Sequence, residues 1–295
     1  MNKQELKKYV EENPLLVSMR ESPAYPGLFV LKYKKRVFFD GLWNDFLEEC
    51  RGTIVDEDFN VVSRPFTKIY NYGVEEKAPV LDTSTQVIAY RKVNGFMVAV
   101  TWYNDDILVS TTGSLDSDFV AMARELIDVE KFKKVCSEHA GVTFMFECVH
   151  RNDPHIITEE EGLYFLGYRV NLWESTVYHD PDVLYSFAVA FGANVVEYRR
   201  FSLGELLKFI KRVRHEGYVF YTQDGVSAKI KSPYYLTLKW MARNPRIDKL
   251  LTKEFREQID EEYYPLLNEI RDSIEEYSAL SEQDRLVWIR EYLSK

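Results

Sequence analysis

Residues 90–100 read YRKVNGFMVAV, which places Lys92 two residues before an Asn-Gly pair. Two stretches of alternating apolar and polar residues, 86–93 and 96–103, flank this pair. Asn-Gly between such stretches is a strong signal for a β-hairpin. We therefore predict a hairpin whose turn lies at Asn94 and Gly95. Taken alone, the stretch favours an ordinary solvated lysine beside this turn over a nucleophile presented by it.

The composition is typical of a folded protein with a large core, since 46% of the 295 residues are hydrophobic and 15% are aromatic. Cys50, Cys136 and Cys148 fit neither a zinc-binding pattern nor a set of disulfides, so we expect free thiols in a reducing compartment. The N-terminal residues predict an amphipathic helix rather than a signal peptide, and no apolar stretch is long enough to span a bilayer. We therefore expect a soluble, cytoplasmic protein.

The net charge of −9 argues at first against a polyanionic partner. The charge is unevenly distributed, because residues 251–295 hold 12 acidic and 6 basic side chains. The rest of the chain is closer to neutral and contains basic clusters such as KYKKR (32–36) and KRVRH (211–215). A local binding surface for a polyanion is therefore compatible with the sequence.

The pattern of apolar residues predicts two different parts of the chain. Strands are expected over residues 28–33, 36–39, 53–56, 61–66, 107–113, 142–149, 163–170, 218–222 and 227–231. Helices are expected over residues 118–139, with Ser117 as N-cap, and over 202–214. After about residue 234 the pattern is helical, and Ser281 with Asp284 predicts a capping box. The predicted fold is α+β, with antiparallel sheets in a domain of residues 1–235 and a short all-helical domain of residues 236–295.

Short motifs for other chemistries are missing, since the sequence contains no GxGxxG, GxxxxGK[ST] or HExxH. The stretch HRNDPH (150–155) brings His150, Asp153 and His155 close together in sequence, which could indicate a metal site. An irregular loop fixes no ligand geometry, so solvated loop side chains are the preferred interpretation.

Polar residues at the ends of apolar strands change the interpretation of Lys92. Glu147 lies inside the apolar stretch FMFECV, where an unpaired carboxylate would be costly. Glu216 precedes a glycine and a strand, and Lys229 and Lys231 share one face of another strand. Each residue alone could be a salt bridge, a turn or a solvated edge. Together they describe a cleft for a polyphosphate and its metal ion.

In chain order, KVNG (92–95), FMFECV (144–149), HEGYV (215–219) and KIK (229–231) resemble motifs I, III, IV and V of the covalent nucleotidyltransferases. This superfamily comprises DNA ligases, RNA ligases and mRNA capping enzymes. The upstream stretches ECRGTIV (49–55), SRPFTKIYNYGVEE (63–76) and TTGSLDSD (111–118) are similar to the bacteriophage RNA ligase family of the RNA ligase 1 type, the tRNA-repair ligases of T-even phages. The resemblance covers roughly residues 45–240 and implies an ATP-grasp-like nucleotidyltransferase domain.

The resemblance implies an ATP-dependent RNA ligase. Lys92 would attack the α-phosphate of ATP and carry AMP, which then passes to an RNA 5′-phosphate before a 3′-hydroxyl seals the strand. Glu216 would lie near the nucleophile and the metal ion, Mg²⁺ or Mn²⁺. Lys229 and Lys231 would contact phosphate, with Lys229 at the α-phosphate. The implied partner is single-stranded RNA or a nicked tRNA with 5′-phosphate and 3′-hydroxyl ends, and no oligomer is implied.

Four further ATP-binding roles follow from the same resemblance. Glu147 would hold the ribose, and Phe165, in the stretch YFLGYRV, would stack on adenine. Arg51 and Lys68 belong to the upstream segments that contact the adenylate or the triphosphate in this family.

A nucleophilic lysine must lose its proton, and free lysine titrates at about 10.4. We expect the neighbouring cations Arg91, Lys229 and Lys231, together with Mg²⁺, to lower the pKa of Lys92. A carboxylate in direct contact would raise it. We therefore predict that Glu216 acts chiefly through hydrated Mg²⁺ rather than by direct contact with Lys92.

Two departures leave alternatives open. Motif I commonly has aspartate where this chain has Asn94, which keeps a turn-forming and acceptor role but lacks the charge. The helical C-terminal part is shorter than in the tRNA-repair ligases, so no particular RNA is implied. A DNA ligase or capping-type enzyme is the first alternative, but these usually carry an OB-fold after motif V. A catalytically silent RNA-binding protein on the same fold is the second.

Overall fold

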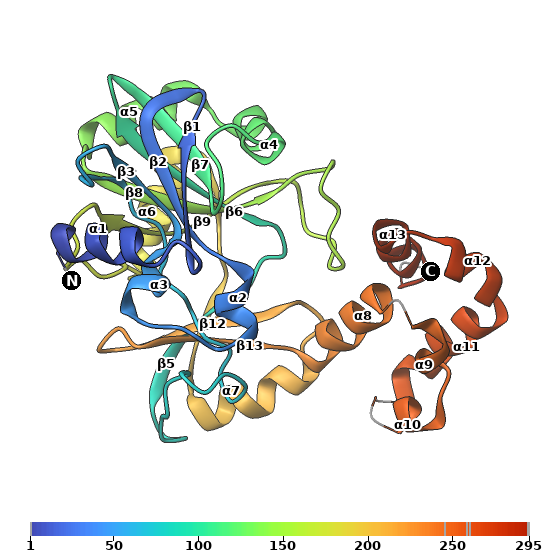
Figure 1. Ribbon diagram of the computed structural model, residues 1–295. Helices are drawn as coiled ribbons and strands as arrows, with labels where there is room; N and C mark the ends of the chain where they lie inside the picture. The colour runs from blue at the N-terminus through green and yellow to red at the C-terminus, as the bar shows by residue number, and fades with distance from the viewer. Residues whose placement is uncertain (1, 245, 258, 260, 294–295) are drawn as a thin grey trace.

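The computed structural model describes residues 2–244, 246–257, 259 and 261–293 (Figure 1). The predicted α+β class is confirmed. The first of three sheets has the antiparallel order β1-β2-β3-β4, formed by β1 (Val17–Ser22), β2 (Tyr25–Tyr33), β3 (Arg51–Asp56) and β4 (Val61–Ser63). Helix α1 (Lys3–Glu12) buries Leu6 and Val10 in the core of this sheet, and α3 (Asp45–Glu49) buries Leu47 there.

The second sheet has the order β10-β9-β8-β6-β7. Its strands are β6 (Phe96–Tyr103), β7 (Asp106–Thr111), β8 (Val142–Val149), β9 (Gly162–Val170) and β10 (Asn194–Val195). Helices α4 (Asp118–Leu126), α5 (Val129–Glu138) and α6 (Pro181–Phe191) contribute to its core. Strand β8 is central and apolar, and six of its eight residues are buried, which explains why it was predictable as a strand.

The third sheet has the order β11-β5-β12-β13. It consists of β5 (Gln86–Arg91), β11 (Tyr198–Ser202), β12 (Gly217–Thr222) and β13 (Ser227–Lys231). Helix α7 (Leu203–Phe209) and the 3₁₀ turn η1 (Ile210–Arg212) cover it, burying Leu203, Leu206 and Ile210 against the strands. Lys229 and Lys231 lie in β13 of this sheet, Glu216 directly precedes β12, and Lys92 directly follows β5.

The predicted hairpin at Asn94 and Gly95 is wrong. Strand β5 pairs with β11 and β12, whereas β6 pairs with β7 and β8 in a different sheet. Neither residue has the positive φ of a type I′ turn. Gly95 is required for another reason, because a Cβ there would lie 2.2 Å from the carbonyl oxygen of Cys148. Residues 92–95 therefore cross from one sheet to the next.

Two other predicted elements differ from the structure. Residues 36–39 belong to the helix α2 (Lys35–Phe39), in which Val37 is buried and the two phenylalanines are exposed. The predicted helix over residues 118–139 is two helices, because Ile127 has extended backbone and the Asp128 side chain caps α5 by accepting from Lys131 N–H. Ser117 makes no side-chain capping hydrogen bond.

A buried ion cluster joins the first two sheets. The Glu49 carboxylate accepts from the guanidinium of Arg64 at 2.7 and 3.0 Å and from that of Arg169 at 3.0 and 3.1 Å. Bidentate arginine–carboxylate pairs fix geometry as well as charge. The cluster therefore fixes the backbone two residues before Arg51, where β3 begins.

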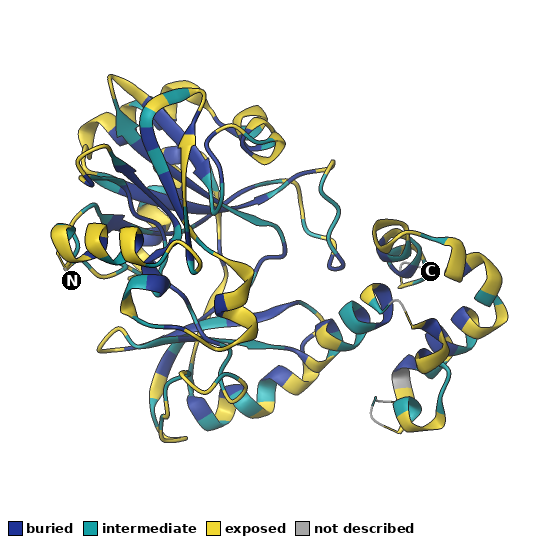
Figure 2. Ribbon diagram, in the orientation of Figure 1, coloured by how far each residue is buried: buried dark blue, intermediate teal, exposed yellow. Residues whose placement is uncertain are grey.

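The C-terminal part is helical, as predicted. Its elements are α8 (Pro233–Arg243), α9 (Ile247–Leu250), α10 (Lys253–Arg256), η2 (Glu261–Tyr263), α11 (Tyr264–Asp272), α12 (Ile274–Ala279) and α13 (Glu282–Leu293). They share one core, which also receives Ile156 and Ile157 from the long loop between β8 and β9. Figure 2 shows exposed outer faces around this core. The boundary at residue 235 stays a prediction, and α8 runs across it.

Ser281 caps α13, as predicted, because its Oγ accepts from the Asp284 N–H at 3.2 Å. The Asp284 carboxylate accepts from the Ser281 hydroxyl at 2.6 Å and not from the backbone N–H that a full capping box would use. The three cysteines are free, as expected, and all three are buried. Within the described ranges, no helix has the length and apolar character needed to cross a membrane.

Candidate active site

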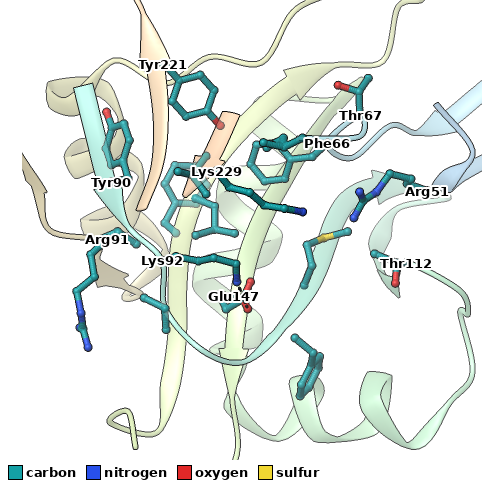
Figure 3. A pocket seen from close by; sticks show the side chains of 18 residues that line it. Arg51, Phe66, Thr67, Tyr90, Arg91, Lys92, Thr112, Glu147, Tyr221 and Lys229 are labelled. Atoms are coloured by element: carbon teal, nitrogen blue, oxygen red, sulfur yellow. Dashed lines mark ion pairs between the residues drawn. The ribbon is translucent and has the colours of Figure 1, made fainter. Parts of the chain in front are cut away.

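A cavity of about 380 Å³ lies where the three sheets meet (Figure 3). Arg51 from β3, Lys92 from the crossover and Lys229 from β13 supply cations to it, and Glu147 from β8 supplies a carboxylate. Much of the remaining lining is apolar, with Phe66, Ile69, Val93, Phe96, Met97, Phe165, Leu166, Val196, Val219 and Tyr221. An apolar pocket with a few convergent polar groups is the usual form of a small-molecule site.

Lys92 is one of the residues that line this cavity. Its backbone N–H donates to the carbonyl of Gly217 at 2.8 Å, so the residue is held beside β12 at the point where β5 ends. Its Nζ lies 3.0 Å from Glu216 Oε2 and 4.0 Å from Glu147 Oε1, and Figure 3 shows the lysine and Glu147 pointing toward each other. The prediction that Glu216 would not contact Lys92 directly is wrong.

The electrostatic expectation for Lys92 is also wrong. Burial lowers the pKa of Lys92, but the nearby carboxylates of Glu147 and Glu216 outweigh burial, and the net pKa lies above its ordinary value. The same contacts lower the pKa of Glu216, where Lys92 and Lys231 together outweigh the opposing effect of burial. Lys92 is therefore held as an ammonium ion in this structure.

Asn94 and Lys231 complete the contacts of Glu216. The Asn94 side-chain amide donates to Glu216 Oε2 at 2.7 Å, and Lys231 Nζ lies 3.2 Å from Oε1. The Asn94 carbonyl oxygen accepts from the N–H of Ile157 at 3.2 Å. Asn94 is only 4% exposed, so its amide serves as a buried bridge and not as a turn residue.

Glu147 is held by the same crossover that presents Lys92. Its Oε1 accepts from the N–H of Gly95 at 3.1 Å, and its neighbour across the sheet is Met97 of β6. Burial raises the pKa of Glu147, and the charge of Lys92 only partly offsets this. The Glu147 carboxylate, although it lies in an apolar strand, is therefore paired with Lys92 and with the Gly95 N–H. An unpaired buried carboxylate would carry a large desolvation cost.

Arg51 and Lys229 are the two cavity cations without an ion-pair partner among the described residues. Burial and the neighbouring charges of Arg51, Lys68 and Lys231 lower the pKa of Lys229 to about 7. Burial also lowers the pKa of Arg51, although a guanidinium remains charged. Two uncompensated cations in a partly apolar cavity favour an anionic ligand.

Lys68 differs from these two. It lies outside the cavity lining, forms an ion pair with Glu75, and has its Nζ 4.9 Å from the ring centre of Trp43 and 4.8 Å from that of Tyr70. Its neighbours Thr67 and Ile69 do line the cavity. The structure thus places Lys68 beside the site with its charge already paired.

Phe165 lies in the wall of the cavity and is 1% exposed, packed within the core of the second sheet. Tyr221 and Leu166 lie in the same lining. The structure thus brings seven of the eight predicted site residues to the cavity lining or into contact with Lys92 or Glu216. Lys68 lies beside them, and the stacking role of Phe165 stays a prediction.

Four residues that belong to the site or contact it were not assigned to it by the sequence analysis. Glu75 pairs with Lys68, and Asn94 was treated as a turn residue. Glu159 forms a 2.6 Å ion pair with Arg91, and the Lys231 ammonium lies 5.0 Å from the ring centre of Tyr235. Glu75 and Glu159 lie in loops whose sequence has no periodic pattern, so their spacing along the chain gave no indication of these pairs.

The weak histidine cluster does not form a metal site. His150 is buried and its Nε2 lies 3.1 Å from Glu125, whereas His155 pairs with Asp153 at 2.7 Å. Across the described part of the chain, no group of three or more His, Cys, Asp or Glu side chains could hold a metal ion. The expectation of solvated side chains is wrong for His150, which is structural.

Replacing Asn94 with Asp is expected to slow the first covalent step by about tenfold at neutral pH. A second carboxylate 2.7 Å from Glu216 would raise the pKa of Lys92 further, and one pKa unit corresponds to a tenfold change in the deprotonated fraction. The pH profile of the single-turnover rate, measured between pH 6 and 9, should lie at higher pH for Asn94→Asp than for the wild type. Asn94→Ala should be slow without that shift, and an Asp variant with the wild-type profile would refute the role of Asn94.

Comparison with known proteins places this geometry in a family. The model of the RNA ligase family matches residues 49–235, which is more than half of the chain. The chain therefore belongs to the RNA ligase family.

Solved structures agree with the fold. An archaeal ATP-dependent RNA ligase superposes with a TM-score of 0.58 at 17% identity, covering 96% of this chain and 80% of that one. A putative ATP-dependent DNA ligase from Aquifex aeolicus has a TM-score of 0.56 at 17% identity, covering 97% of this chain and 76% of its own. At this identity the likeness concerns the fold alone, and it confirms the predicted nucleotidyltransferase fold with its helical C-terminal part.

Proposed function

We propose that this protein is an ATP-dependent RNA ligase of the RNA ligase 1 type, which joins RNA 5′-phosphate and 3′-hydroxyl ends. The observation that carries the proposal is the position of Lys92. It reaches into a nucleotide-sized cavity together with Arg51 and Lys229, two cations that have no ion-pair partner among the described residues. A lysine nucleophile beside uncompensated cations suits attack on a triphosphate.

In the first step, Lys92 Nζ forms a bond to the α-phosphorus of ATP, the bond from that phosphorus to the bridging oxygen breaks, and pyrophosphate leaves. The lysine gives up the proton that it holds as an ammonium. Glu216 Oε2, 3.0 Å away, is the carboxylate oxygen positioned to accept it. Because Asn94 and Lys231 also hold this carboxylate, its orientation toward Lys92 is fixed before the nucleotide arrives.

The cavity wall suggests how the nucleotide lies. Lys229, on β13 of the third sheet, lines the same cavity as Lys92 and would contact the α-phosphate. Arg51 lies at the start of β3 on the same cavity (Figure 3). The base would lie against the apolar wall that includes Phe165 and Tyr221. Glu147 would accept hydrogen bonds from the ribose. Lys68 and Lys231 would support this arrangement from beside the cavity.

A divalent cation, Mg²⁺ or Mn²⁺, would neutralise charge on the triphosphate. Among the described residues no three-ligand group is preformed for it, and Mg²⁺ is commonly held by one or two carboxylates, water and substrate phosphates. We assign Glu216 to this cation. The contact would run through a water molecule, because Lys92, Asn94 and Lys231 already contact the carboxylate oxygens of Glu216.

The two remaining steps use RNA ends. An oxygen of an RNA 5′-phosphate attacks the AMP phosphorus, the P–N bond to Lys92 breaks, and the RNA carries a 5′-5′ pyrophosphate-linked adenosine. A 3′-hydroxyl then attacks the RNA phosphate, loses its proton and releases AMP. Broken single-stranded RNA or a nicked tRNA in the cytoplasm is the substrate class we propose, which would make the protein an RNA repair enzyme.

The experiment follows a 5′-labelled oligoribonucleotide with ATP and Mg²⁺ through adenylated RNA to circular or joined product. We expect RNA to be sealed with ATP, and GTP to give no product. The same assay on an oligodeoxyribonucleotide and on nicked duplex DNA is the control. Preferential sealing of DNA would instead support the DNA ligase alternative, and no product on any substrate would support a catalytically silent RNA-binding protein.

A further inference from the structure

Helix α2 presents two aromatic rings to solvent. Phe38 is 55% exposed and Phe39 is 76% exposed, and their ring centres lie 5.7 Å apart in an edge-to-face arrangement. Leu42, just after the helix, is 39% exposed. Single exposed apolar side chains are common, but adjacent exposed aromatic rings often mark a binding surface.

The surroundings of these rings are cationic. Lys34 and Lys35 are exposed and have no ion-pair partner among the described residues, and Lys32 on β2 is exposed as well. Arg36 is paired within the helix, at 3.0 Å from Asp40. In a protein with a net charge of −9, this local excess of lysine is a departure from the average surface. It favours an anionic partner.

The surface adjoins the proposed active site. The Lys68 ammonium lies 6.0 Å from the ring centre of Phe38, and the residues on either side of Lys68 line the cavity. Figure 1 shows α2 between the first sheet and the ends of β12 and β13, and Figure 2 shows it as an exposed helix. A chain that leaves the cavity past Lys68 would therefore meet α2.

We propose that α2 is a stacking platform for single-stranded RNA next to the reacting end, with bases on Phe38 and Phe39 and phosphates at Lys34 and Lys35. The proposal rests on the function proposed above. Nonspecific single-strand binding commonly combines aromatic stacking with a positively charged path along the backbone. A patch dominated by two rings and flanked by unpaired lysines suits alternating bases and phosphates better than it suits an apolar protein interface.

The test uses Phe39, which is more exposed than Phe38 and has no contact with Lys68 among those described. In the full-length protein, Phe39→Ala is expected to raise the KM for an oligoribonucleotide about tenfold. Its rate of self-adenylylation with labelled ATP should stay at the wild-type value. Phe39→Trp should restore the KM, because tryptophan also stacks on bases. Tyr185→Ala, at a side chain 59% exposed on α6, is the matched control and should change neither quantity.

The lysines are tested separately. Lys34→Gln combined with Lys35→Gln should raise the KM and reduce the salt dependence of binding of fluorescent oligo(U), since fewer phosphate contacts release fewer counterions. If self-adenylylation is normal and the KM for RNA is unchanged in both variants, the platform is refuted while the proposed function stands.

Two further outcomes also separate the proposals. A wild-type protein that binds oligo(U) through Phe39 but forms no adenylate would refute the proposed function and leave the platform intact. A dimer that Phe39→Ala converts to a monomer, with RNA binding unchanged, would identify α2 as an interface between copies of this chain and would refute the platform.

Discussion

Replacing Lys92 with Arg should abolish the covalent adenylate and lower sealing of RNA by at least about 1,000-fold, in line with the loss of a catalytic nucleophile. Arg keeps a positive charge against Glu216 and Glu147, which lie 3.0 and 4.0 Å from the lysine. The substitution therefore avoids leaving the buried Glu147 carboxylate without an ion pair, which would destabilise the fold, while Glu216 also keeps its ion pair with Lys231. Its guanidinium stays protonated and cannot attack phosphorus. Gel-based transfer of label from α-labelled ATP measures the effect.

Two controls make this result specific. Lys133→Arg, at a surface lysine paired with Asp106, should label normally. RNA that has been adenylated beforehand should still be sealed by the Lys92→Arg variant, because the last step does not use the lysine as a nucleophile. Full labelling of the Lys92→Arg variant would overturn the assignment.

Replacing Lys229 with Met should weaken ATP binding by about 10- to 100-fold, the range expected for loss of a charge-assisted hydrogen bond to phosphate. The same change should raise the melting temperature. Lys229 lies near Arg51, Lys68 and Lys231, and burial together with these cations lowers its pKa to about 7. The folded state therefore bears an unfavourable charge there, which methionine removes. Calorimetric titration with ATP and thermal unfolding measure the two effects.

The sign of the pH dependence follows from this pKa. The folded pKa of Lys229 is about 7 and the ordinary value is 10.5, so between these pH values the unfolded chain binds more protons and stability rises with pH. The gain from Lys229→Met should be largest below pH 7 and should vanish near pH 10.5.

ATP binding should show the opposite trend for the wild type. Affinity should weaken as the pH rises above 7, because the lysine must then take up a proton. Lys229→Arg is the matched control, since arginine stays charged and should remove this trend while keeping affinity. A Lys229→Met variant that binds ATP as tightly as wild type would contradict the phosphate role.

The parts of the fold that were predictable are those with a strong local pattern. The buried strand β8 and the capped helix α13 follow from apolar runs and capping chemistry alone. The crossover at Asn94 and Gly95 was not predictable in this way, because the pairing of β5 depends on residues far away in the sequence. Strand β5 pairs with β11 and β12, which come more than a hundred residues later. Gly95 is needed because the backbone passes close to the Cys148 carbonyl. A glycine required for such close packing cannot be distinguished in the sequence from a glycine required for a tight turn.

The site was predictable as a set of residues but not as a network. The order of Lys92, Glu147, Glu216 and Lys229 along the chain indicated the chemistry. The direct contact between Lys92 and Glu216, and hence the raised pKa of the lysine, depends on how β12 lies beside the end of β5. The separation of Lys92 and Glu216 along the sequence does not indicate the distance between their side chains. The same applies to Asn94, whose buried amide holds Glu216 in place.

The central claim is that Lys92 is the residue that carries AMP. The most direct measurement is mass spectrometry of peptides from wild-type protein incubated with ATP and Mg²⁺ and digested under alkaline conditions, in which the P–N bond survives. We predict an AMP adduct on the peptide that contains Lys92, and its loss after addition of pyrophosphate or of RNA bearing a 5′-phosphate. An adduct at a different residue, or no adduct under conditions in which RNA is sealed, would contradict the account.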